Sequence, residues 1–201
     1  MKTFLILCAL ATLGTASAST KDFGVYGGLN AATIHSPASN LSATGGLLIG
    51  AQTFLPLNET LEFTPSLQLA QRGFSVDNVS VVGSPFTVDV HYHATFLELP
   101  LLFRAKVPVG TLDSYLTAGP NFGLKLGSSC SIRGGYQCTV LNDESVKSTL
   151  FGIELGFGSD FILSNTNEVG FEVRYHLGFT QFAKDTEGKN RGLALLFHFN
   201  F

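Results

Sequence analysis

Charged residues are scarce in this 201-residue chain: Asp, Glu, Lys and Arg make up 13% of it, against about 25% in an average soluble domain. Tryptophan is absent and methionine occurs once. No apolar run reaches the roughly 18 residues that a membrane-spanning helix needs. Lys and Arg number 12 against 15 Asp and Glu, which argues against nucleic acid as a partner. The abundant residues, 22 Gly and 18 Phe, suit strands and turns better than helices.

The N-terminus has the parts of a secretory signal peptide. Lys2 supplies a positive charge, Phe4–Leu13 is an apolar stretch, and Ala16–Ala18 is a small-residue cleavage site. A buried N-terminal helix is the alternative, but Lys2 and the small residues argue against it. We therefore expect residues 1–18 to be a cleaved signal peptide and residues 19–201 to form one exported domain.

Two cysteines, Cys130 and Cys138, remain after that cleavage. An even count in an exported chain permits a disulfide, and the pair brackets a short polar stretch rich in glycine. Two free thiols are the alternative. A metal site is disfavoured because two cysteines alone do not complete a tetrahedral shell.

The main signal in the rest of the chain is alternation with a period of two, which is typical of strands. In the last segment Leu193, Leu195 and Phe197 share one face, whereas Ala194 and His198 share the other. The same alternation predicts eight strands: residues 22–30, 46–55, 61–72, 97–106, 115–125, 151–160, 169–179 and 192–201.

The two faces of these strands predict a lipid environment. The apolar faces carry no Asp, Glu, Lys or Arg, and a Lys or Arg facing lipid at the bilayer midplane costs about 2–4 kcal/mol. The opposite faces are rich in glycine and small polar residues, which suits a tight interior better than an aqueous exterior. Strands in a bilayer must also close into a barrel, because every backbone donor needs a partner there.

The connections alternate between short and long, as they do in outer-membrane barrels. The sequence therefore predicts an all-β fold, an eight-stranded antiparallel up-and-down transmembrane barrel with short periplasmic turns and long outer loops. The short connections are expected near 56–60, 108–113 and 164–167, and the long ones near 34–44, 75–90, 127–147 and 181–190.

Two features depart from a simple ladder. Pro100 and Pro120 lie inside strand patterns, where we expect bulges or a locally missing hydrogen bond. Thr87–Thr95 also lacks clean alternation, which leaves its register open.

Several short motifs resemble the PorT-like small outer-membrane β-barrel family of Bacteroidetes-type bacteria, in order along nearly the whole mature chain. They are Gly24–Asn30, Leu67–Gly73, Leu97–Leu102, Ala118–Pro120, Arg174–Gly178 and the closing Phe201. The resemblance implies an outer-membrane barrel exported by its signal peptide and inserted by the barrel-assembly machinery, with Phe197, Phe199 and Phe201 as the C-terminal assembly signal. Some members act in secretion or gliding, which makes a surface or secretion-system protein a candidate partner.

Ionisable residues on the inward faces form the candidate site. Acids and bases are equal in number, and the lumen of eight strands is just wide enough for side chains, so we expect a salt-bridged plug. A narrow channel for small solutes is the alternative. The predicted lumen network is Glu62, Arg72, Glu98, Arg104, Lys106, Lys125, Glu154, Asp160, Glu172 and Arg174.

Enzyme activity is the rival class, because some eight-stranded barrels modify lipid A. That chemistry needs a nucleophile or base facing lipid near the outer rim, whereas His176 and His198 point inward by parity. His91 and His93 could share a strand face, but two ligands are too few for a metal. No phosphate-binding glycine loop opens a helix. We expect no catalytic residue, cofactor or metal site.

A structural or surface-binding role remains, in which the barrel holds mobile loops at the outer surface. The longest predicted loop, Gly127–Lys147, is the best candidate for contacting a partner.

Overall fold

The computed structural model describes residues 23–35, 41–80, 87–107, 113–132, 136–137, 147–163, 167–181 and 188–201. The predicted signal peptide, Cys138 and parts of the predicted connections lie outside these residues. None of the described residues form a helix long and apolar enough to cross a membrane. The described strands are β1 (Phe23–His35), β2 (Leu41–Ser42), β3 (Thr44–Thr53), β4 (Leu55–Pro56), β5 (Leu61–Ser80), β6 (Thr87–Lys106), β7 (Asp113–Ile132), β8 (Tyr136–Gln137), β9 (Thr149–Ile162), β10 (Glu168–Gln181) and β11 (Lys189–Asn200).

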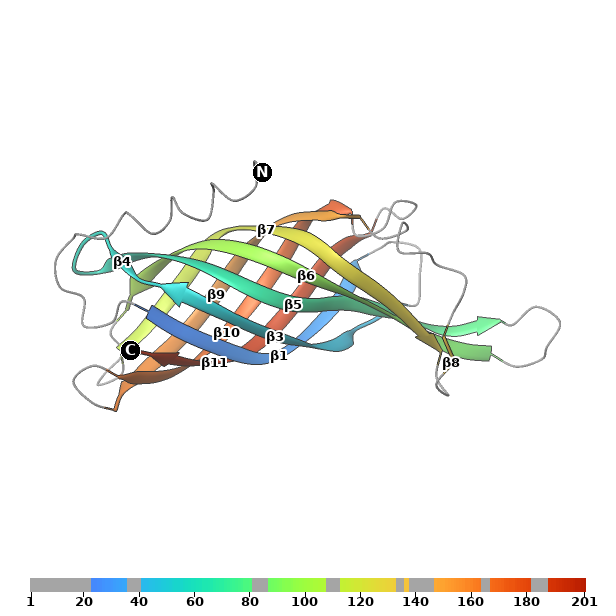
Figure 1. The fold of residues 1–201 in the computed structure, drawn as a ribbon, viewed down its shortest axis with the longest axis horizontal. Helices are drawn as coiled ribbons and strands as arrows, with labels where there is room; N and C mark the ends of the chain where they lie inside the picture. Colours follow the sequence, from blue (N-terminus) through green and yellow to red (C-terminus); the bar gives the residue numbers. More distant parts are fainter. Residues whose placement is uncertain are drawn as a thin grey trace, which may run out of the picture.

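Eight of these strands are long, and they close into one antiparallel barrel (Figure 1). The order around the wall is β1, β3, β5, β6, β7, β9, β10 and β11, and β11 pairs with β1. Phe23 and Phe201 extend this last pairing, since each donates its backbone N–H to the other's carbonyl, at 3.2 and 2.9 Å. The predicted eight-stranded antiparallel barrel is confirmed.

The two faces of each strand differ in exposure as the alternation predicts. On β11, Leu195 is 59% exposed, whereas its neighbour Leu196 is 1% exposed. The outward residues of the other long strands, such as Leu29, Ile49 and Leu124, are likewise exposed and apolar. An apolar exterior on every side suits a wall that faces hydrocarbon.

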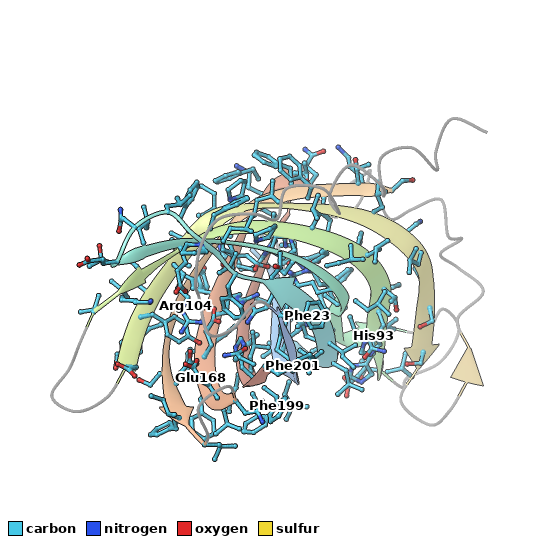
Figure 2. All side chains as sticks on the ribbon, turned by 60° about the vertical axis from the view of Figure 1, so that its left-hand side comes forward. Phe23, His93, Arg104, Glu168, Phe199 and Phe201 are labelled. Carbon is cyan, nitrogen blue, oxygen red and sulfur yellow. The ribbon has the colours of Figure 1, made fainter. Side chains whose placement is uncertain are left out.

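Phenylalanine rings gather at two heights on the outer wall. One group lies at the end with the short connections and both Phe23 and Phe201 (Figure 2), which we call the turn end. The other joins Phe151 to rings on β7 and β10, toward the opposite end, which we call the loop end. From Phe151 to Phe161 on β9 is about 33 Å along the strand, or about 25 Å along the barrel axis at a tilt of about 40°. This matches the apolar band between the aromatic girdles of membrane barrels.

The strand ends at the loop end differ from the prediction. The β5–β6 hairpin continues to Ser80 and Thr87, where a loop from Ser75 to Val90 is expected. β7 likewise continues past Gly127 to Ile132 and pairs with β8. The barrel wall therefore carries a three-stranded sheet beyond its rim, visible in Figure 1 as the long ends of β5, β6 and β7.

No bulge occurs at either proline, and the ladder shows the other expected outcome, a local loss of pairing. The β5–β6 register is the same on both sides of Pro100, but no pair is formed between Pro65–Leu101 and Gln68–Glu98. Pro120 pairs with Ile153 of β9, but on its β6 side no pair is formed between Pro100–Asn121 and Phe103–Ala118. The described register shifts lie elsewhere: between Thr95 and Phe96 on β6, Val76 and Val79 on β5, and Leu177 and Gln181 on β10. The shift at Thr95 leaves Leu126 of β7 as the extra residue, so β6 itself keeps one register with β5 from Val90 to Ala105.

Candidate functional site: a charged lumen with an apolar layer above it

The middle of the lumen is filled by ion pairs and amides that share two carboxylates. Arg72 donates from Nε to Oε1 of Glu98 at 2.5 Å and from Nη2 to Oε2 at 2.8 Å. Gln68 and Asn121 also donate to Glu98 Oε2, at 2.7 and 2.9 Å. Asn121 reaches Glu154 Oε1 as well, at 2.8 Å, and so joins the two carboxylates. A buried charge held this way has its lone pairs satisfied.

The second ion pair of this layer lies on a single strand. Arg174 donates from Nε to Oε1 of Glu172 at 2.7 Å and from Nη2 to Oε2 at 2.9 Å. Thr117 donates to the same Oε1 at 2.9 Å, and His198 Nε2 lies 3.2 Å from Oε2. Arg174 Nη1 also lies 3.4 Å from Glu154, which links this pair to the first. Arg72, Glu98, Glu154, Glu172 and Arg174 thus form one set, which we call the charge network.

A separate group lies nearer the turn end. Arg104 pairs with Asp160 and lies 3.7 Å from Glu62 Oε2. Its guanidinium carbon sits 3.5 Å from the centre of the Tyr115 ring, a cation–π arrangement. Lys106 Nζ reaches Glu62 Oε1 at 2.8 Å from the rim, where the lysine side chain is half exposed.

The predicted lumen residues thus fall into three groups. Eight of the ten are buried on the inner face, namely Glu62, Arg72, Glu98, Arg104, Glu154, Asp160, Glu172 and Arg174. Lys106 lies at the turn-end rim and is paired there. Lys125 is half-buried near the loop end of β7. The sequence gives the inner face of each residue by parity, but the register alone decides which acid meets which base.

Sequence reasoning missed an apolar layer at the loop end of the lumen. Ile34, Phe74, Ala94, Phe96 and Leu150 are buried on the inner faces of β1, β5, β6 and β9 and form one cluster, which we call the apolar cluster. Val76 and Tyr92 pack against it from above, and Tyr92 stacks on Phe74 with ring centres 4.8 Å apart. The signal that could have found it is a change of phase. The outward apolar residues of β6 have odd numbers from Leu97 to Phe103, whereas toward the loop end the apolar residues of that strand, Ala94 and Phe96, have even numbers.

Two glycines leave room for tyrosine rings inside the wall. A Cβ on Gly50 would lie 2.6 Å from the Tyr26 ring, and one on Gly158 would lie 2.4 Å from Tyr115. Tyr26 uses the space to donate its hydroxyl to Gln68 at 2.9 Å. The small residues of the inner face therefore serve packing in a narrow lumen.

Both inward histidines lie where parity places them. His198 stacks on Tyr26, with ring centres 5.3 Å apart, and its Nδ1 lies 3.3 Å from Gln52 Nε2. His176 Nδ1 lies 3.5 Å from Glu154 Oε1. Among the residues that the structure describes, no group of three or more His, Cys, Asp or Glu could hold a metal ion.

The extensions of β5, β6 and β7 beyond the rim form a sheet that we call the loop-end sheet. One serine–histidine contact lies on its outer face. Ser75 Oγ is 2.5 Å from Nδ1 of His91, its direct partner across β5 and β6. This is the nucleophile–base arrangement that an esterase uses. However, Ser75 is only 4% exposed, so a substrate cannot approach its hydroxyl without displacing neighbours. The contact suits a cross-strand pair that stabilises the sheet.

His93, two residues further along the same face, is half-buried. Burial lowers its pKa, and the charge of His91 lowers that pKa further. The neutral ring is therefore favoured at this position.

A small cavity lies beside the charge network. It is bordered by polar side chains of Asn30, Arg72, Glu154, Arg174 and His176 and by the backbone at Gly192. It has room for about one water molecule. Leu48, Leu193 and Ala194 complete the lining. Asn30 Oδ1 and both ring nitrogens of His176 are buried without a hydrogen-bond partner among the described residues, so they offer partners to a water molecule there.

The comparisons with known proteins concern the family and the fold. A model of the outer membrane protein beta-barrel domain matches residues 16–184. Among solved structures, Neisserial surface protein A is 12% identical with a TM-score of 0.48 and covers 92% of this chain and 100% of its own. The attachment invasion locus protein Ail of Yersinia pestis is 12% identical with a TM-score of 0.47, covering 90% of this chain and 99% of its own.

OprG from Pseudomonas aeruginosa is 11% identical with a TM-score of 0.44, and the match covers 90% of this chain and 93% of that one. The comparison with curated proteins gives no match. Since the family model covers most of the sequence, and the structure is a closed barrel with an apolar wall, the chain belongs to the outer membrane protein beta-barrel domain family, which indicates the outer membrane as its location.

Proposed function

We propose that this protein is a closed, non-enzymatic outer-membrane barrel that holds a binding surface at its loop end. The observation that carries the proposal is the lumen itself. Its charged side chains are buried and engaged with one another, as Arg72 is with Glu98 and Arg174 with Glu172. A lumen filled in this way favours a plug over a conduit.

The loop-end sheet supports the binding role. β5, β6 and β7 each have 20 residues, twice the roughly 10 residues that cross a bilayer. Short strands cover both edges of this sheet, since β2 pairs with β5 and β8 pairs with β7. A paired sheet loses less conformational entropy on binding than a free loop does.

Residues 133–146, between β7 and the approach to β9, are the proposed contact segment. They replace the longer predicted loop Gly127–Lys147, because Gly127–Ile132 belongs to β7. We propose that a Cys130–Cys138 disulfide pins this segment where it leaves the sheet.

Replacing residues 133–146 with a short glycine–serine linker tests the surface. The altered barrel should stay heat-modifiable on gels, because its eight long strands are unchanged and only the short β8 is removed, and it should no longer bind host or bacterial surface proteins that the original captures. A matched replacement of the turn residues Leu57–Thr60 at the opposite end should leave capture intact. Capture that survives the first replacement would contradict the assignment.

Two measurements test the closed and non-enzymatic parts. Single-channel recordings of the purified barrel in planar bilayers should show absent or very small conductance, and stable openings of porin size would refute the closed lumen. Fluorophosphonate probes, which label activated serines, should leave Ser75 unmodified. Labelling that is lost in Ser75→Ala would instead favour the rival function, a lipid-A-modifying enzyme.

Several finer assignments complete the proposal. Residues 1–18 would act as the cleaved signal peptide, and Phe197, Phe199 and Phe201 as the signal to the barrel-assembly machinery. The motifs that resemble the PorT-like family favour membership of that family, and a secretion-system protein is then a further candidate partner. Membrane fractionation with N-terminal sequencing of the mature protein tests the first of these, because the expected first residue is Ser19.

A further inference from the structure

The lumen has two compartments with different chemistry. The lower compartment, nearer the turn end, contains the charge network and the cavity beside His176. The upper compartment, at the loop end, contains the apolar cluster, whose members Ala94 and Phe96 are at most 1% exposed. Water and ions respond differently to these two environments, since a polar space offers them partners and an apolar constriction does not.

The lower compartment is not sealed by apolar packing. A second cluster of buried apolar residues lies there, formed by Tyr26, Leu48, Ala70, Ala194 and Leu196. These come from β5, β3, β1 and β11, which are consecutive neighbours around the wall. They line one side of the lumen, and the charge network occupies the other. Buried polar atoms that have no hydrogen-bond partner in the described part of the chain, such as Asn30 Oδ1 and Asn121 Oδ1, also lie in this compartment.

The apolar cluster spans a wider arc of the wall. Its members lie on β1, β5, β6 and β9, whereas β3 and β7, which lie between these strands, contribute none. On β7, which separates β6 from β9, Gly123 lets Phe96 and Leu150 come close: a Cβ there would lie 3.7 and 3.3 Å from them. The remaining sector, on β10 and β11, holds Gly178 and the fully buried Asn190, whose two side-chain polar atoms have no hydrogen-bond partner among the described residues.

We infer that the apolar cluster, and not the charge network, is the permeability barrier that closes this lumen to water and ions. The inference rests on the proposed closed lumen and assigns its closure to named residues. The polar compartment below then holds water without conducting, because the cluster above it excludes water by dewetting.

The test measures ion and proton flux through liposomes that contain the folded full chain. Phe96→Ser should raise the flux at least tenfold, because a hydroxyl replaces the ring that reaches Gly123. Phe74→Ser is the second variant, should the first fail to fold. Leu48→Ser removes an equally buried apolar side chain from the lower cluster and should stay at the original rate. Glu154→Gln disturbs the charge network and should also stay at that rate.

Heat-modified migration on gels establishes which samples are folded. The inference is overturned if folded Phe96→Ser and Phe74→Ser leak no more than the original, or if Glu154→Gln or Leu48→Ser leaks as much as they do. Failure of the proposed function looks different: if the original protein itself conducts at porin size, the closed lumen is refuted before any variant is compared, and the inference fails with it.

Discussion

Arg174 and Glu172 form a two-point ion pair although they belong to the same strand, two residues apart on its inner face. The guanidinium and the carboxylate are both buried, and each also engages a group on another strand. The pair is therefore a local element that ties β10 to β7 and β9.

Removing one partner of this pair should destabilise the barrel strongly. Arg174→Met leaves the Glu172 carboxylate buried without its main partner, and breaking a buried pair in this way costs about 3–5 kcal/mol. The double variant Arg174→Met with Glu172→Gln should lose less, because no uncompensated charge remains. Urea unfolding in lipid vesicles measures both. Equal losses in the single and double variants would show that the buried charge is not the cause.

A methyl group on Gly50 should also destabilise the barrel, for a steric reason. The added Cβ would lie 2.6 Å from the Tyr26 ring, and overpacking of this kind typically costs about 1–3 kcal/mol. Gly45→Ala on the same strand is the control, since its added Cβ meets no described atom within 4 Å beyond its chain neighbours. We expect that control to unfold at nearly the original urea concentration, and a matching loss at both sites would exclude the tyrosine as the reason.

The free-energy cost of a charge on the outer wall should depend on where it lies along the barrel axis. Leu195→Arg, at the middle of β11, should lower the unfolding free energy by about 2–4 kcal/mol, because a cation there faces hydrocarbon. Leu57→Arg changes a similarly exposed residue, at 56%, that lies in a turn. Its effect should be about 0–1 kcal/mol. If both variants lost the same free energy in vesicles, the wall would not be facing lipid.

The Cys130–Cys138 disulfide can be tested by mass spectrometry. Arg133 lies between the two cysteines, so trypsin should separate them into two peptides. Without reductant we expect these peptides to appear as one joined mass, and with reductant as two. Separate masses in both conditions, in protein purified from outer membranes without reductant, would mean that the thiols are free.

The loop-end sheet should weaken in acid through His93. The pKa of His93 is lowered in the folded protein, so the stability that its neutral ring contributes is present above the unfolded pKa of about 6.5. That contribution is lost as the pH falls through the folded pKa. Intrinsic amide exchange slows as the pH falls, so the quantity to compare is the protection factor, and that of the β5–β6 amides beyond the rim should fall between pH 7.5 and pH 5. His93→Gln should abolish this fall, and an unchanged fall in that variant would assign it to another group.

The barrel itself could be predicted from the sequence because lipid imposes one rule on every strand. Between the two aromatic groups, outward positions must be apolar, and Leu193, Leu195 and Phe197 show the period directly. Beyond the membrane that rule ends, since water bathes the outer face. There the apolar residues, such as Phe74 and Tyr92, turn inward while Ser75 and His91 face outward. This inversion is why the β5–β6 extension was predicted as a loop.

The sequence predicts which charged residues lie in the lumen, but only in part which of them pair with one another. Parity places Glu98 and Arg72 on the inner face, but their meeting depends on the β5–β6 register, which the hairpin fixes. Glu172 and Arg174 are the exception, because two residues on one strand need no register to be neighbours. The apolar cluster required both the register and the phase change, so it emerged only from the structure.

The seam at which Phe23 and Phe201 exchange backbone hydrogen bonds joins the earliest described strand to the latest. Until β11 pairs with β1, both strands present an edge of unpaired backbone groups, which a bilayer interior does not tolerate. The contact that closes the barrel is therefore also the contact between its two most distant strands in the sequence, so no shorter fragment of the described chain contains a closed wall.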